Sequence, residues 1–304
     1  QFAMSHPDAA CLRALAAYVA EASGSALNLL PHGANSNGAW KAGALPHRGP
    51  GGAQAGPGMN GAQMLASPRK CYLLWGLEPG FDIDNPSRAL AAFAEAETVI
   101  VISPFALRGL RAVADLLIPL APHPESEGSL ENLDGETFGF AAAGRLSGQS
   151  RPGWKILRKA GGELGLDGFS QVDLAGVQAD MQAAMSGADL ALSETELTSA
   201  DVADGLFRIG DVPMYRVDAL CRRSGPLQQT VQSESDFVGL NPADAEALGL
   251  SEGDRARVRQ GETRSEFDVI VSERVPVGGA WLRSATCETH MLQHAVGPLT
   301  VEVA

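Results

Sequence analysis

The residues that could do chemistry gather in one glycine-rich stretch near the N-terminus. Between Gly33 and Gly61 the sequence has nine glycines, and the asparagines Asn35 and Asn37 lie among them. Glycine lets backbone amides approach a ligand closely, and asparagine tolerates left-handed backbone. At the end of a strand, such a loop can cradle an anionic or nucleotide-like group. The alternative is a long surface loop whose glycines and prolines only set turns. The candidate cradle residues are Gly33, Asn35, Asn37, Gly38 and Gly43.

Metal chemistry has one candidate, near the C-terminus. Cys287, His290 and His294 have the spacing C-x2-H-x3-H, in which two histidines four residues apart would share a helix face. No fourth ligand is evident and H-E-x-x-H is absent, so a loop before the last strand is favoured and no metal site is predicted. The cysteines include no C-x2-C pair, which excludes the usual spacing of zinc ribbons and iron–sulfur clusters. They are Cys11, Cys71, Cys221 and Cys287.

Carboxylates gather in two segments. Between residues 121 and 148 they lie among turn-forming residues with only His123 nearby, so a solvated loop with an Asp134-Gly135 turn is favoured over acid–base chemistry. Between Glu163 and Asp211 ten carboxylates face a single basic residue, Arg208. This composition predicts an acidic arm that orders on a partner, or else a solvated face. No catalytic residue is predicted.

Composition limits the function classes further. The net charge of −13 argues against nucleic acid as a partner, because phosphate binding needs a basic stripe. No apolar run approaches the roughly 20 residues of a membrane helix, and the N-terminus lacks the order of a signal peptide. A cytoplasmic location is therefore expected. The first methionine is Met4, and a helical pattern begins almost at once, so we interpret the sequence as a piece of a longer protein.

The elements around the glycine-rich stretch predict an α/β domain. Ala26–Leu30 should be a short buried strand that leads into the stretch, and Cys71–Gly76 a strand buried on both faces. Helices and strands alternate after it, which predicts a parallel sheet covered by helices. The further strands are expected at 98–102 and 116–120, and the helices at 5–24, 85–93, 105–113 and from Trp154.

The last part of the sequence predicts a small β-barrel with one helix. Asn241 and Pro242 mark the start of that helix, and Gly249 marks its end. Period-two alternation then predicts strands at 255–260, 267–271, 280–282 and 299–303. The predicted domains are an α/β dinucleotide-binding-like domain (1–165), an acidic linker (166–235) and the barrel (236–304).

Six segments together resemble a known family. They are LLPHGANSNGAWKAGALPHRGPGG, YLLWGLEPGFD, ADLLIPLAPHPESEGSLENLDG, RPGWKILRKAGGELG, PMYRVDALCRRSGPLQQT and VGLNPADAEALGLSEGDRARVR. In this order they resemble the C-terminal part of the G subunit of bacterial NADH-quinone oxidoreductase, respiratory complex I. The resemblance covers nearly the whole chain and is weakest across residues 168–206. The wider relatives are molybdopterin oxidoreductases, whose α/β domains and C-terminal double-psi barrel hold a bis-guanine-dinucleotide cofactor.

The resemblance implies iron–sulfur clusters in an N-terminal region that this sequence lacks. It also implies that the complex I subunit has lost the molybdenum cofactor, so that Asn35, Gly38 and Gly43 would be relics kept for packing. Where relatives often have arginine in an N-x-E-G-R motif, this chain has Glu136 after Gly135, which disfavours contact with an anion there. The implied partners are the N-terminal region and other subunits of the complex I peripheral arm, at the cytoplasmic side of the inner membrane.

Two functions from different classes follow. In the first, the chain is a redox-inactive scaffold without a cofactor, and the isolated chain should be colourless and free of molybdenum. In the second, it is the cofactor-binding C-terminal portion of a molybdopterin-dependent oxidoreductase. Lys41, His47 and Arg48 are the cations of the glycine-rich stretch that could hold phosphates, and they are too few for two dinucleotides. A free NAD-binding module is disfavoured, because no G-x-G-x-x-G joins a strand to a helix.

Overall fold

The structure is a computed structural model in which two compact units alternate along the chain. It describes residues 8–30, 33–106, 108–185, 205–233 and 236–304. Unit 1 comprises Gln1–Ala26, Leu77–Ala94 and Thr195–Ala304, and unit 2 comprises Leu27–Gly76 and Glu95–Glu194. Most of the predicted acidic arm, residues 186–204, lies outside the described residues. The predicted domain boundaries after residues 165 and 235 stay a prediction.

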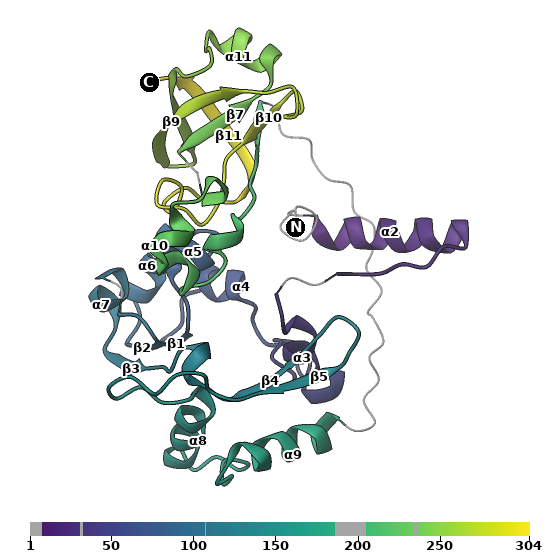
Figure 1. The fold of residues 1–304 in the computed structure, drawn as a ribbon, viewed down its shortest axis with the longest axis vertical. Coiled ribbons are helices and arrows are strands. Elements are labelled where there is room, and N and C mark those ends of the chain that lie inside the picture. Colours follow the sequence, from purple (N-terminus) through teal and green to yellow (C-terminus); the bar gives the residue numbers. More distant parts are fainter. Residues whose placement is uncertain (1–7, 31–32, 107, 186–204, 234–235) are drawn as a thin grey trace. The chain divides into compact units, whose positions relative to one another are not determined.

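Unit 2 is built on the predicted parallel sheet. Its strands are β1 (Cys71–Trp75), β2 (Thr98–Ser103) and β3 (Leu116–Pro119), paired in that order and all parallel (Figure 1). The prediction that β1 is buried on both faces was wrong. Tyr72 and Leu74 are buried, but Leu73 is 50% exposed, because alternate side chains of a strand point to opposite faces.

The remaining elements of unit 2 surround the glycine-rich stretch. The predicted strand at Ala26–Leu30 does not form, and these residues are exposed. The predicted solvated loop of residues 121–148 instead holds the hairpin of β4 and β5, which turns at Asp134 and Gly135 with φ +84° at the glycine. The elements are α3 (Ser36–Lys41), η1 (Pro50–Gly52), α4 (Gly61–Ala66), α7 (Arg108–Val113), η2 (His123–Glu125), β4 (Gly128–Glu131), β5 (Thr137–Phe140), α8 (Gly153–Glu163) and α9 (Leu174–Met185).

Unit 1 contains the predicted barrel, which is closed (Figure 1, green to yellow). Its ring order is β10–β6–β11–β8–β9–β7, with two parallel pairs, β6 with β10 and β7 with β9. The strands are β6 (Leu206–Ile209), β7 (Phe237–Leu240), β8 (Arg255–Gln260), β9 (Thr263–Val271), β10 (Gly279–Trp281) and β11 (Val296–Val303). β6 falls inside the predicted linker, so that segment supplies a wall of the barrel.

Apolar side chains of all these strands fill the barrel. Val238, Val258 and Phe267 have no measurable exposure, and Leu282, just after β10, is equally buried. The predicted helix forms as α11 (Pro242–Leu248), and its Ala245 belongs to this core. The Asn241 side chain accepts a hydrogen bond from the Ala243 N–H, and Gly249 ends the helix in the left-handed conformation.

Further short helices belong to unit 1. They are α2 (Ala9–Ser23), α5 (Pro79–Asp82), α6 (Pro86–Ala94), η3 (Met214–Arg216), η4 (Cys221–Arg223), α10 (Gly225–Gln228) and η5 (Val231–Ser233). Among the described residues, no helix combines the length and the apolar character needed to cross a bilayer.

Candidate functional site

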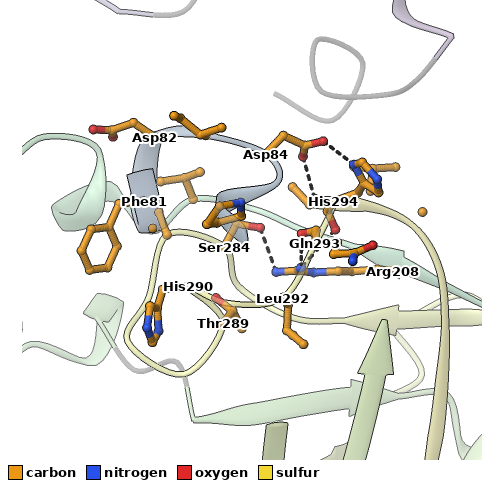
Figure 2. A pocket seen from close by; sticks show the side chains of 18 of the residues that line it. Phe81, Asp82, Asp84, Arg208, Ser284, Thr289, His290, Leu292, Gln293 and His294 are labelled. Carbon is orange, nitrogen blue, oxygen red and sulfur yellow. Dashed lines mark hydrogen bonds and ion pairs between the residues drawn. The ribbon is translucent and has the colours of Figure 1, made fainter. Parts of the chain in front are cut away.

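A pocket of about 680 Å³ lies in unit 1, beside the barrel. One wall, called the α5 wall, is formed by α5 and the loop that follows it. The other wall is the segment between β10 and β11 (Figure 2). Its volume is within the range of pockets that hold small molecules and cofactors. The polar side chains that line it are Asp82, Asp84, Arg208, Ser284, Thr289, His290, Gln293 and His294.

The base of the pocket holds a buried arginine. Arg208 lies on β6 and is 1% exposed. Its Nη1 donates to the carbonyl oxygens of Gln293 (3.3 Å) and His294 (3.0 Å) and to Gln260 Oε1 (3.2 Å). Its Nη2 donates to Ser284 Oγ at 3.2 Å. Its Nε is buried and has no hydrogen-bond partner among the described residues. A donor therefore remains for a further acceptor.

No carboxylate of the described residues forms an ion pair with Arg208 at close range. Burial lowers the pKa of Arg208 to about 10, and the negative charge of Asp84 acts to raise it. The guanidinium is therefore charged at neutral pH. Its hydrogen-bond partners in the described part of the chain are neutral, and burying a charge without a counter-charge is unfavourable. An anionic ligand in this pocket would offset that cost.

A salt-bridge cluster fixes the α5 wall of the pocket. Glu78 is 2% exposed and accepts from Arg222 Nη1 at 3.1 Å and from Arg223 Nη2 at 2.6 Å. The other end of the Arg222 fork binds Asp82, and the guanidinium lies 4.9 Å from the ring centre of Phe81. The cluster contains two carboxylates and two arginines, so its net charge is zero. It holds α5 against η4.

The opposite rim is closed by a contact between the two walls. Asp84 pairs with His294 Nδ1 and also accepts a hydrogen bond from the Ala295 N–H at 3.1 Å (Figure 2). Both side chains are more than half exposed. Asp84 does not cap the helix that follows it. Asn85 Oδ1 does so, accepting from the Arg88 N–H at 3.0 Å.

The predicted cradle residues lie in unit 2, where the side chains of Asn35 and Asn37 bind other residues of the chain. Asn35 Oδ1 accepts from the Glu131 N–H at 2.8 Å, and Asn37 Nδ2 donates to the Asn132 carbonyl at 3.2 Å. A Cβ on Gly38 would lie 2.2 Å from Asn35 Oδ1, and one on Gly43 only 2.4 Å from backbone. These contacts explain the glycines by close packing.

A smaller pocket of about 360 Å³ borders this stretch, and Gly33 is among its lining residues. The neighbouring cations are already engaged. Lys41 pairs with Glu131 at 2.8 Å, and Arg48 donates to the Gly52 carbonyl at 3.3 Å. The binding role of the stretch stays a prediction.

The C-x2-H-x3-H segment forms a loop rather than a helix. His290 Nδ1 lies 2.5 Å from the Cys287 carbonyl oxygen, whereas His294 turns to Asp84. Within the described ranges, no three His, Cys, Asp or Glu side chains gather as they would around a metal ion.

Sequence reasoning missed Arg208 as a site residue. The sequence feature that could have revealed it is that Arg208 is the one basic residue of an acidic stretch and stands within the apolar run Leu206 to Ile209. A charge inside a short apolar strand is unusual unless it has buried partners. The run was too short to be recognised as a strand.

Comparison with known proteins connects this chain to molybdopterin proteins. Residues 220–298 match the family described as the Molydopterin dinucleotide binding domain. The chain is 24% identical over 224 residues to the NADPH-Fe(3+) oxidoreductase subunit alpha of two strains of Geobacter sulfurreducens, DL-1/KN400 and ATCC 51573. The match covers 69% of this chain and 26% of the relative, so the chain spans about a quarter of these curated relatives.

A solved structure supports the fold. Acetylene hydratase from Pelobacter acetylenicus aligns with a TM-score of 0.57 at 12% identity, over 85% of this chain and 48% of its own. The predicted α/β architecture with a parallel sheet and a small β-barrel is confirmed. The narrower resemblance to the complex I G subunit is not among these matches.

The prediction that this part of the protein has no cofactor was wrong. The match of residues 220–298 associates the barrel with a molybdopterin-type dinucleotide. The prediction considered only the cations of the glycine-rich stretch, which are too few to hold the phosphates of two dinucleotides. The buried cation Arg208 lies instead on a barrel strand, where the sequence had indicated a linker.

Proposed function

We propose that this chain is the cofactor-binding C-terminal portion of a molybdopterin-dependent oxidoreductase, and that the pocket beside the barrel receives a phosphate-bearing part of the cofactor. The observation that carries the proposal is Arg208, a buried charge that lines the pocket and whose Nε–H has no partner among the described residues. The family match over residues 220–298 supports the ligand class.

The residues present fit a phosphate group. Phosphate oxygens accept charge-assisted hydrogen bonds, and arginine recognises them through a planar set of donors. The hydroxyl of Ser284 also lines the pocket and is nearly buried, so it could donate to the same ligand, whereas Thr289 already donates to the Arg283 carbonyl at 2.8 Å. A dinucleotide would be held by its linking phosphates, and the apolar lining around Phe81 and Leu292 would exclude water.

The chain's own residues would bind and orient the cofactor. When bound, a molybdopterin cofactor supplies a redox-active metal to the enzyme. Arg208 would fix a phosphate at the barrel, and the carbonyls of Gln293 and His294 fix Arg208 in turn. The Glu78–Arg222 cluster would keep the α5 wall in place. These are binding and positioning roles, and none of these residues is assigned a catalytic one.

The experiment is to isolate the chain from a host that makes the dinucleotide cofactor and to measure the pterin and nucleotide that acid releases. We expect bound dinucleotide in the wild type, and at least a tenfold lower content in Arg208→Gln. Arg255→Gln is the matched control, because it removes an exposed arginine of the same barrel that is 47% exposed and lies outside the pocket lining. Wild-type chain that contains no dinucleotide, and takes up none from extracted cofactor, would refute the proposal.

A narrower candidate is the G subunit of NADH-quinone oxidoreductase. Six segments in the order of that family favour it. In this case the partners would be the N-terminal region of the same subunit and the other subunits of the peripheral arm, and the protein would lie in the cytoplasm at the inner membrane. Affinity purification of the tagged full-length protein tests this candidate. Co-purification of the NADH-oxidising and quinone-reducing subunits supports it, and their absence contradicts it.

A further inference from the structure

We propose that Asp84 acts as a displaceable counter-charge that limits how tightly the barrel pocket holds a phosphate-bearing ligand. The inference rests on the proposed function for the class of ligand. Asp84 on the rim would weaken binding of the ligand, whereas Arg208 at the base of the pocket would strengthen it.

Among the described residues, the Asp84 side chain contacts none of its sequence neighbours in the helix that follows it. An acidic residue just before a helix usually accepts hydrogen bonds from the first turn. Here Asn85 accepts the Arg88 N–H with its side chain and the Ala89 N–H with its carbonyl. The Asp84 side chain instead contacts His294 and Ala295, which are 210 and 211 residues away in sequence.

The two carboxylates that line the pocket, Asp82 and Asp84, differ in how their charges are compensated. Asp82 pairs with Arg222, whose side chain is only 6% exposed, so its charge is neutralised within the wall. Asp84 has an exposed histidine as its partner, and its own side chain is 61% exposed. The negative charge of Asp84 also acts on Arg208, whose pKa it raises. Of the two, Asp84 is the carboxylate that an incoming anion would meet as a like charge.

The contact between Asp84 and His294 is weak enough for a ligand to open it. Ion pairs between exposed side chains contribute little to stability. Hydrogen bonds from a buried guanidinium to a phosphate are stronger, because they are charge-assisted and screened from water. A phosphate group can therefore displace Asp84 from the rim, but it does so against the repulsion of that carboxylate.

The test measures binding of inorganic pyrophosphate to the 304-residue chain by isothermal titration calorimetry at neutral pH. Pyrophosphate stands for the charged middle of a dinucleotide. Asp84→Asn removes the charge but keeps an oxygen that can accept from the Ala295 N–H. We expect Asp84→Asn to bind pyrophosphate about three- to tenfold more tightly than wild type, as one unit of nearby charge allows.

Two variants complete the comparison. Asp268→Asn removes one negative charge from β9, where Asp268 pairs with exposed Arg255, and it should leave the affinity within twofold of wild type. Asp84→Asn/Arg208→Gln should lose binding, which places the gain at Arg208. Equal affinity of wild type and Asp84→Asn would overturn the proposal, as would an equal gain in Asp268→Asn. Failure of both wild type and Asp84→Asn to bind pyrophosphate would overturn it too.

The outcomes separate this inference from the proposed function. Because pyrophosphate is supplied directly, a tighter Asp84→Asn complex supports the role of Asp84 even if no dinucleotide is found on the isolated chain. If the dinucleotide is found and pyrophosphate binds wild type and Asp84→Asn equally, only the role of Asp84 fails.

Discussion

Replacing Arg222 should destabilise unit 1 far more than replacing an exposed arginine. Arg222 binds Glu78 and Asp82 with the two ends of its guanidinium, donates from Nε to the Arg216 carbonyl at 2.8 Å, and stacks over Phe81. Arg222→Met keeps much of the side-chain volume and removes all of these interactions. Glu78 would then stay 2% exposed with Arg223 as its remaining cation.

The magnitude follows from burial. Removing one partner of a buried ion pair costs about 3–5 kcal/mol, because the other charge is left uncompensated. Arg223 still contacts Glu78 at 2.6 Å, and Asp82 is 24% exposed and can be hydrated, so the lower end applies, about 3 kcal/mol. Arg222→Lys keeps the charge but cannot reach both carboxylates at once, and it should lose roughly half as much.

The assay is hydrogen exchange of the barrel amides at increasing urea, read by mass spectrometry. It reports the free energy of opening of unit 1 alone, so it does not require the two units to unfold in one step. Arg255→Met is the control. Its pair with Asp268 is about half exposed on both sides, so the loss should stay below about 1 kcal/mol. Equal losses in Arg222→Met and Arg255→Met would refute the reasoning that burial decides the contribution of these pairs.

Three further predictions concern other parts of the chain. Phe267→Ala should lower the free energy of unfolding of the barrel by about 3–5 kcal/mol in urea titrations, since this side chain has no exposure. Gly43→Ala should lower the free energy of unfolding of unit 2 more than Gly165→Ala does, in urea titrations that follow unit 2. Both glycines have positive φ, but only the first also meets backbone within 3 Å. Burial acts to raise the pKa of Asp218, but hydrogen bonds from Cys221 and the Leu220 N–H, with Arg222, bring that pKa below its ordinary value. Its contribution is therefore present above the ordinary pKa of an aspartate and is lost as the pH falls through the lowered pKa, so wild type should lose more stability than Asp218→Asn as acid is added.

The sequence predicted those elements whose signals are local. Asn241 and Gly249 marked both ends of α11 correctly, and the strands from 98 to 103 and from 116 to 119 were recognised by their apolar runs. The strand β6 was missed, because its four residues form a barrel wall only through partners that come much later in the chain. Pairing over such separations leaves no periodic pattern to read.

The site was missed for the same reason. The cations of the glycine-rich stretch are close in sequence, but Lys41 is already paired with Glu131. The pocket is assembled from residues near 84, 208 and 294, which are far apart in the sequence. Its cation, Arg208, appeared in the sequence only as the single basic residue of an acidic arm. Arg208 indicates a binding site only because it is buried. The sequence around a single charged residue does not show whether that residue is buried.

The late partners of β6 also have a consequence for synthesis of the protein. β6 is complete at residue 209, whereas its neighbours β10 and β11 begin at residues 279 and 296. At the usual ~5–20 residues per second, a ribosome needs on the order of 10 s to make that interval. During this time Leu206 to Ile209 has apolar side chains and no strand to pair with. A charge within such a segment hinders association with other nascent chains, so Arg208 would protect the growing polypeptide before it ever meets a ligand.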